Sequence, residues 1–338
     1  MALALATGLV WLSLASAGGA PDSLRARLPG IAAASLRPSV CRNPAGAEQS
    51  ALWSRVSGGA VRAFCEHLVR AQIRLERSPA AALELALRAH QALPEEAAPL
   101  VLAGRALLRQ GQVPSAYERF AASRSKSSSG LADAAALREF AAAATLLGRT
   151  AEAAALYRKL VLRSDLPDDP AFRRLIVLEA ASLLGASGPD SLPEAEVWLS
   201  EARRGPGAPG FEDLTSALLA LALARKGDVE QASLVAAEIP GPWALERFLS
   251  KGDAMRVERF VLPAGEAAPA PLPAPVFIAG APQLAAGELH LAIAVSLSER
   301  DPSLSRLHLS AYLDGPGKNA PWRGFAEQRL AALLRARR

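Results

Sequence analysis

Apolar positions recur along this chain at the three- and four-residue spacing of amphipathic helices, and the pattern itself returns after 34 residues. The echo consists of two matched sets, Ala82, Ala86 and Ala89, followed one period later by Ala116, Phe120 and Ser123. Pro and Gly residues interrupt the helical pattern at regular intervals and divide it into pairs. A period of this length built from two helices predicts a stack of helix pairs, that is, an α-solenoid.

The spacing predicts about five helix pairs between residues 61 and 246. Their expected bounds are Val61–Arg77 with Pro79–Leu93, Ala97–Gln110 with Pro114–Ser123, Leu131–Leu147 with Ala151–Arg163, Ala171–Leu184 with Glu194–Arg204, and Phe211–Lys226 with Val229–Ile239. The breaks have local chemical causes. Ser78 is a natural N-cap before Pro79, and Gly148 supplies a turn.

The remaining segments are assigned from their composition. Residues 1–17 are expected to be a signal peptide, and residues 18–60 a linker with a short helix at Ala51–Val56. Residues 247–283 are too rich in Pro and Ala for regular structure and are predicted to be an irregular connector. Residues 284–338 are expected to form a helix pair and a capping helix, at Leu284–Arg300, Pro302–Leu313 and Pro321–Arg338.

Composition supports an all-α fold and argues against nucleic acid as a partner. The chain is 51% hydrophobic, only 5% aromatic and rich in Ala and Leu, which lose little side-chain freedom in a helix. The net charge is +5, and only five of the 38 basic residues are Lys. The Arg residues are scattered among Asp and Glu rather than gathered in one basic face, so nucleic-acid binding is not expected.

The first 17 residues favour export to the periplasm or secretion. They carry no charged side chain and end in a small-x-small motif, and the apolar run is too short for a stable membrane anchor. The two cysteines of an exported chain are expected to pair, Cys41 with Cys65, although two inert thiols are the alternative. A reactive thiol is disfavoured because Cys65 and His67 would point to different faces of a helix.

The small and large positions within the helix pairs resemble the tetratricopeptide repeat (TPR) family. The matching residues are Leu100, Ala103, Gly104, Leu107, Gly111, Ala116, Phe120 and Ser123, then Leu137, Phe140, Ala141, Ala144, Gly148, Ala153, Tyr157 and Leu160, and a third set at Leu219, Ala220, Leu223, Gly227, Ala232, Ala236 and Ile239. The family's usual first-helix Trp and Tyr are absent. The resemblance implies a right-handed α-solenoid that binds proteins or peptides; a solenoid of another family is the structural alternative.

Motifs that carry chemistry are not found. The four His residues have no metal-ligand spacing, no phosphate-binding loop occurs, and acidic pairs such as Asp168 and Asp169 lie at helix ends, where they act as caps. No catalytic residue, cofactor, metal or small-molecule substrate is therefore expected.

The TPR resemblance also implies that the first helix of each pair lines a concave groove. Arg side chains on those helices would then project inward and could hold the carboxylates of an acidic partner; they are Arg74, Arg105, Arg109, Arg138 and Arg225. A solvated helical face is the simpler alternative. The expected function is an exported, non-catalytic scaffold for a protein or peptide. The alternatives are the helical superstructure of a peptidoglycan-acting enzyme, or a cytoplasmic TPR scaffold.

Overall fold

A computed structural model describes residues 39–42, 51–126, 131, 133–163, 166, 169–204, 211–239 and 282–336. These residues form helices joined by turns and short loops, and they contain no β-strand. The expected signal peptide at residues 1–17 lies outside the described residues. So do most of the linker at 18–60 and the connector at 247–283, except for its last two residues.

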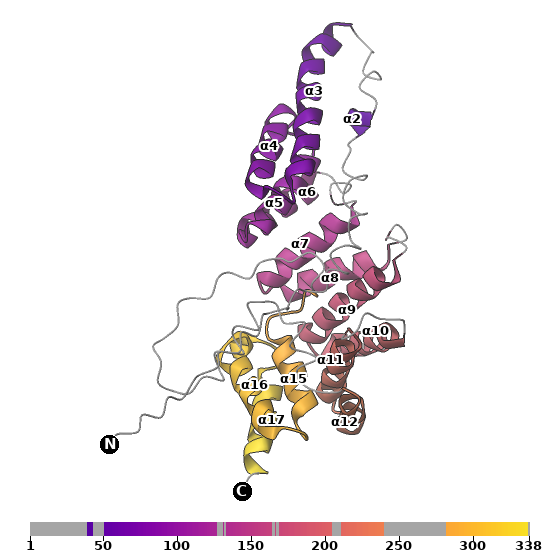
Figure 1. Cartoon of the computed structure of the whole chain (residues 1–338), viewed down its shortest axis with the longest axis vertical. Helices are drawn as coiled ribbons and strands as arrows, with labels where there is room; N and C mark the ends of the chain where they lie inside the picture. Colours follow the sequence, from indigo (N-terminus) through magenta and orange to yellow (C-terminus); the bar gives the residue numbers. More distant parts are fainter. Residues whose placement is uncertain are drawn as a thin grey trace, which may run out of the picture.

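Consecutive helices pack against one another and build an elongated stack (Figure 1). Its helices are α2 Ser39–Arg42, α3 Ala51–Arg74, α4 Pro79–Ala92, α5 Ala98–Arg109, α6 Val113–Lys126, α7 Ala134–Leu146, α8 Thr150–Val161, α9 Pro170–Ser187, α10 Leu192–Arg204, α11 Phe211–Lys226, α12 Val229–Ala237, α15 Glu288–Leu297, α16 Pro302–Asp314 and α17 Arg323–Arg335, with short 3₁₀ turns at Pro189–Ser191 and Pro316–Asn319. The predicted all-α class and the helical repeat are confirmed for the described residues.

One predicted boundary is wrong. The short helix expected at Ala51–Val56 and the helix expected from Val61 form the single helix α3. Gly58 and Gly59 lie between the two predicted segments and lower the helix propensity without forbidding the helical conformation. The first pair therefore begins inside the region assigned to the linker.

Glycines make the turns between the two helices of several pairs. Gly111, Gly148 and Gly227 follow α5, α7 and α11, and their φ angles are 74°, 71° and 97°. These angles lie in the left-handed region, which side chains other than Gly rarely adopt. The turn residues expected from the repeat pattern are thus confirmed, because only Gly reverses the chain there without strain.

Small residues inside a pair allow its two helices to approach closely. A Cβ atom on Gly104 of α5 would lie 3.0 Å from the ring of Phe120 on α6, so the ring fills the space that the missing side chain leaves. Phe120 is fully buried and stacks against Phe140 of the next pair at 5.7 Å between ring centroids. The aromatic residue thus joins two pairs, as the repeat pattern predicts.

The buried residues form two clusters that meet on α9. Ile176, Ala180 and Leu183 of α9 belong to a cluster that extends from α3 to α10. Leu175 and Leu178, on the same helix, belong to a second cluster that extends to α17. The inner helix α9 is consequently buried on most of its circumference, and it connects the two halves of the stack.

The last helices run in an unexpected direction. Arg225 at the end of α11 donates to the carbonyl of Gly185 near the end of α9, so these two helices are parallel. Glu288, the first residue of α15, also pairs with Arg225, whereas Arg300, just beyond α15, donates to the carbonyls of Ala237 and Ile239 at the far end of the α11–α12 pair. Helix α15 is therefore antiparallel to α11, which the sequence pattern did not indicate.

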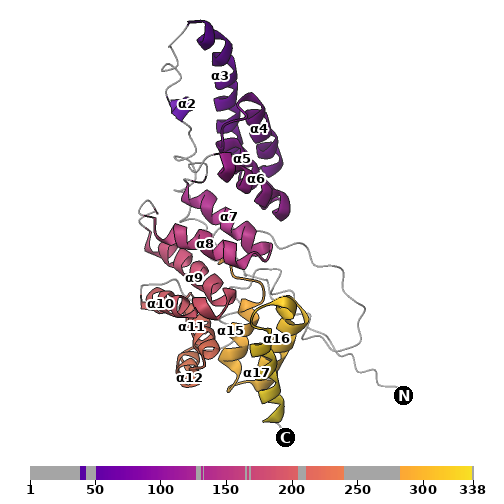
Figure 2. The ribbon, with the colours of Figure 1, turned by 180° about the vertical axis from the view of Figure 1, so that it is seen from behind.

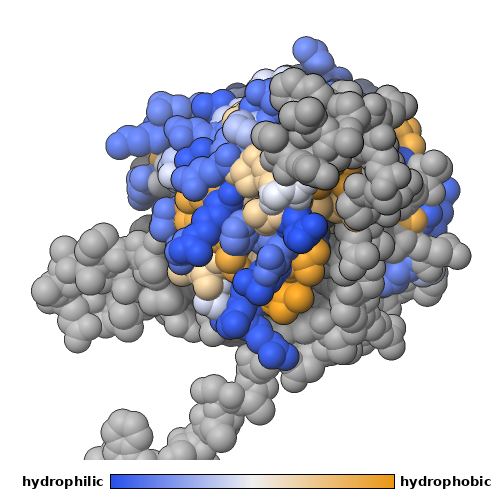
Figure 3. Space-filling model, turned by 90° about the horizontal axis from the view of Figure 1, so that it is seen from above, coloured by the Kyte–Doolittle hydropathy of each residue, from blue (hydrophilic) through white to orange (hydrophobic). Residues whose placement is uncertain are grey.

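The stack is long and narrow. Helix α15 packs beside α11, α16 packs on α15, and α17 packs on α16 (Figures 1 and 2). Seen from the end at which α3 lies, hydrophilic side chains form ridges, with hydrophobic ones showing between them (Figure 3). The strongly exposed large hydrophobic residues of the described part are scattered along the stack, at Ile73, Leu162, Val197, Val229, Leu234 and Leu334.

Candidate functional site

The arginines predicted to line a groove lie on the first helices of the pairs, and most of them meet carboxylates of the chain itself. Arg105 and Arg109 lie one turn apart on α5, Arg138 lies on α7 and Arg225 lies on α11. Arg74 is the exception, because it is exposed at the end of α3.

Arg105 and Arg109 share one buried carboxylate from the following pair. Glu139 of α7 accepts from Arg105 Nε at 2.7 Å and from Arg109 Nη2 at 3.1 Å. Arg109 also reaches back to Glu76, in the turn after α3, at 2.7 Å. Burial alone would raise the pKa of Glu139, but the two guanidinium groups hold that pKa below its ordinary range. Glu139 therefore connects its own pair to the preceding one, and Arg109 extends the connection to the first pair.

Arg138 forms the second pair, with Glu179 of α9. Its Nε donates to Glu179 Oε2 at 2.9 Å and its Nη2 to Oε1, which is the bidentate geometry that a guanidinium favours. The Glu179 side chain has 0% exposure and that of Arg138 has 6%. The same Oε1 accepts the backbone N–H of Gln283 at 2.9 Å. A buried carboxylate in the centre of the stack thus contacts three separate segments.

Arg225 forms the third pair and joins four segments. It holds Glu288 through two hydrogen bonds of 2.7 and 2.8 Å, and its Nη1 donates to the Gly185 carbonyl at 3.0 Å. The indole of Trp322, just before α17, donates to the same carbonyl at 2.8 Å, and the guanidinium lies 4.6 Å from the centroid of its ring. Arg225 therefore fixes the reversed helix α15 and the capping helix α17 against α9 and α11.

The outer helices carry a similar series of contacts between successive pairs. The Tyr117 hydroxyl of α6 donates to Glu152 of α8 at 2.7 Å, and Arg158 of α8 donates to Glu194 of α10 at 3.1 Å. Arg203 of α10 pairs with Glu238, next to α12. The partners in these contacts are separated by 35 or 36 residues, close to the 34 that separate Arg105 from Glu139. Polar contacts therefore recur at the repeat length.

This arrangement corrects the expectation of an Arg row open to a partner. The side chains of Arg105, Arg138 and Arg225 are between 1% and 6% exposed, and each already holds a carboxylate of this chain. Arg109 is 12% exposed and is also paired. The positions of the arginines on the inner helices follow from the repeat pattern, but a single helical pattern does not show what a neighbouring pair places opposite them. A Glu one repeat after an Arg, such as Glu139 after Arg105, was the signal available in the sequence.

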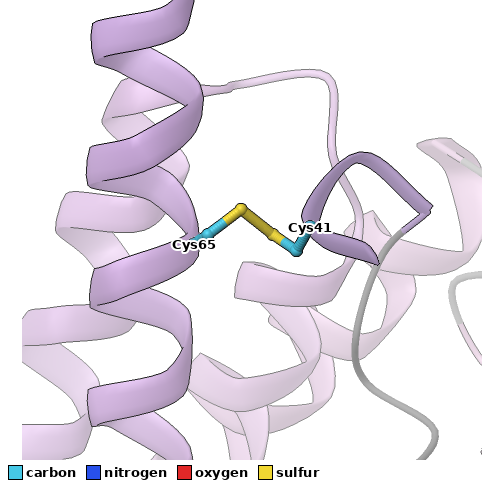
Figure 4. The surroundings of a disulfide bond; sticks show 2 residues. All are labelled: Cys41 and Cys65. Atoms are coloured by element: carbon cyan, nitrogen blue, oxygen red, sulfur yellow. A yellow bond between two sulfur atoms is a disulfide. The ribbon is translucent and has the colours of Figure 1, made fainter. Parts of the chain in front are cut away.

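Cys41 and Cys65 form a disulfide that ties α2 to α3 (Figure 4). Their Cα atoms are 5.7 Å apart, within the usual range for a bridged pair. Because Cys41 lies in the short helix α2, the bond holds a segment of the N-terminal region against the first pair.

A buried histidine pair between α15 and α16 was not singled out by the sequence analysis. The Nδ1 atoms of His290 and His308 lie 3.1 Å apart, and the two residues are 6% and 1% exposed. Burial, together with the neighbouring imidazole of His290, lowers the pKa of His308 to about 4. At neutral pH His308 is thus uncharged, and one of the two Nδ1 atoms donates to the other.

Metal and membrane sites were sought in the part of the chain that the structure describes. It contains no group of three or more His, Cys, Asp or Glu residues arranged to hold a metal ion. Nor does any helix there combine the length and the apolar character that crossing a bilayer requires. Comparison with known proteins gives no match to a family model, to a curated protein or to a solved structure.

Proposed function

We propose that this chain is an exported, non-catalytic scaffold, a right-handed TPR-like solenoid that binds a protein or a peptide. The observation that carries the proposal is the way the stack is built. Successive pairs are joined by charged and polar side chains as well as by apolar packing, which favours a stiff, extended array. Arrays of this kind present long surfaces to other macromolecules, and their buried charges hold the array together.

Export is supported by the disulfide, because such bonds persist in oxidising compartments and are rare in the cytosol. Protein should therefore be taken directly from cells under acid quench, so that its thiols keep their native state. It should show no thiol that reacts with a maleimide, and two reactive thiols after denaturation and reduction. Two reactive thiols in denatured but unreduced protein would contradict export and favour the cytoplasmic scaffold. The Cys41→Ala variant is a useful control, because it leaves one thiol under both conditions.

A partner is expected at the one predicted groove arginine that remains exposed. Arg74 lies at the end of α3, two residues before Glu76, which is itself paired with Arg109. Its free guanidinium suits a carboxylate on an acidic partner.

This site can be tested in cells that express the full chain with a photoreactive amino acid at position 74. The expected result is a discrete adduct of higher mass, which is absent when the same group replaces exposed Glu118 on the outer helix α6. The absence of a discrete adduct at both positions would count against a scaffold that binds through this face. If the purified protein released soluble fragments from peptidoglycan, the enzyme alternative would be favoured instead.

A further inference from the structure

An extended segment of the chain lies along the inner helix α9. Residues 282–285 precede α15 and form neither helix nor strand. Gln283 is only 8% exposed, and its backbone N–H reaches Glu179 at 2.9 Å across a sequence separation of 104 residues. Leu284 packs against the C-terminal core cluster and Ala285 against the N-terminal one. The segment therefore lies where the two clusters meet.

The segment is fixed at both ends by charged groups. At its start, the carboxylate of Glu179 accepts a main-chain N–H. At its end, Arg225 donates two hydrogen bonds to the carboxylate of Glu288. Between these anchors lie Leu284, Ala285, Ala286 and Gly287, which are mostly small and apolar.

Neither anchor depends on an unusual side chain of the segment. A backbone N–H is available on any residue except Pro, and a carboxylate is available on Asp, on Glu or at a chain end. Residues 286 and 287 form a turn, in which Gly287 has a φ of 84°, and Glu288 begins α15. A peptide that is extended over four residues, turns at a glycine and then presents a carboxylate would satisfy the same groups. The binding of extended peptides through main-chain hydrogen bonds and a charged clamp is well suited to a fixed surface of this kind.

We propose that the face of α9 and α11 between Glu179 and Arg225 is a peptide-binding site, occupied in cis by residues 282–288. The site selects an acidic peptide of this shape, extended at first and turning at a glycine before its carboxylate, and the chain's own segment keeps the site closed until such a peptide displaces it. This proposal deepens the scaffold function and rests on it for the existence of an external peptide. Because the cis segment is tethered, its effective concentration is in the millimolar range (about 1 mM or more), so a free competitor binds only weakly to the closed form.

The test uses a labelled synthetic peptide of residues 282–290 and two forms of the full chain. In the open form, the cis segment carries Gln283→Gly, Leu284→Ser, Ala285→Gly and Glu288→Gln, which removes its packing and its carboxylate. The peptide should bind the open form at least about tenfold more tightly than the unaltered chain, because the tethered competitor has been removed. Circular dichroism checks that the open form has kept its helices.

Two altered peptides report on the anchors. N-methylation of the Gln283 amide removes the donor to Glu179, and Glu288→Gln in the peptide removes the carboxylate held by Arg225. Each change should weaken binding to the open form by about tenfold or more, because the first leaves Glu179 without its main-chain donor and the second leaves the buried Arg225 guanidinium without its carboxylate. Equal affinity of the open form for all three peptides would overturn the proposal, and so would equal affinity of the two chain forms for the unaltered peptide.

A second measurement uses the unaltered chain and does not depend on the folding of a variant. Hydrogen exchange of the amides in residues 283–287 should be slow, and it should speed up when millimolar unlabelled peptide is added. Exchange that is unaffected by the peptide would contradict displacement. If the peptide binds but position 74 yields no adduct in cells, the cis-occupied site stands and the scaffold proposal loses its support. If an adduct forms but the peptide does not bind, only the present proposal fails.

Discussion

Replacing Glu179 by Leu should lower the free energy of unfolding by about 4 kcal/mol, because removing one partner of a buried ion pair leaves the other charge uncompensated. Arg138 is buried, and a guanidinium does not lose its proton inside a protein, so its charge stays in the interior when Glu179 is removed. The variant also removes the acceptor of the Gln283 N–H. Urea denaturation followed by circular dichroism measures the loss.

Two matched variants separate the charge effect from the loss of packing. Glu76→Leu removes a carboxylate that also pairs with an Arg but is 65% exposed, and should cost no more than about 0.5–1 kcal/mol. Adding Arg138→Met to Glu179→Leu should restore most of the lost stability, because apolar residues often replace a buried ion pair at little cost. If Glu179→Leu lowers the free energy of unfolding by no more than Glu76→Leu does, then Arg138 and Glu179 do not form the buried ion pair described above.

Stability should fall by about 3 kcal/mol as the pH is lowered from about 6.5 to about 4, since one pKa unit corresponds to about 1.4 kcal/mol. The cause is His308, whose pKa in the folded chain is about 4, below the 6.5 of an unperturbed histidine. Between these values the unfolded chain binds the proton and the folded chain does not, so acid favours unfolding. Above pH 6.5 the effect is absent. Urea titrations at steps of half a pH unit give the curve.

Between pH 6.5 and 4.5, the change in stability comes from the histidines rather than from the carboxylates. The pKa of Glu139 is held below its usual value of 4.5, so its contribution is lost only at lower pH. The pKa of His90 is also lowered, by burial and by Lys126 and Arg119, and adds in the same direction. His308→Leu should remove most of the fall in stability between pH 6.5 and 4.5, whereas His90→Leu should leave most of it. A fall that survives in His308→Leu would assign the effect elsewhere.

The helix pairs could be predicted because their signals are local. Gly111 lies between α5 and α6 and Pro114 lies in the first turn of α6, and the apolar spacing on either side of the break can be recognised within a few helical turns. The same kind of signal gave a wrong boundary at Gly58 and Gly59, where a break between two helices was predicted. Two glycines lower the stability of a helix but do not end it when the flanking residues favour the helix.

The environment of the arginines could not be predicted because it depends on distant residues. The repeat pattern places Arg138 on an inner helix, but its partner Glu179 is 41 residues away, and that of Arg225 is 63 residues away. Both distances exceed the repeat length, so the 34-residue echo does not point to them. The reversal of α15 depends on these same contacts. The histidine pair was missed because residues 18 apart on two helices meet only after the helices have packed.

The carboxylate of Glu139 pairs with two arginines that lie one turn apart on α5, and one of these, Arg109, also pairs with Glu76 of the first pair; this has a consequence for how the array could change in evolution. Along this run, a buried charge on one pair finds its partner on another pair: Arg105 of α5 pairs with Glu139 of α7, and Arg138 of α7 pairs with Glu179 of α9. A duplicated or deleted pair would leave an Arg or a Glu buried without its partner, at a cost of several kcal/mol (about 3–5). Arrays held together by apolar packing alone can gain or lose units with little penalty. In this chain, the charges fix both the number and the order of its central repeats.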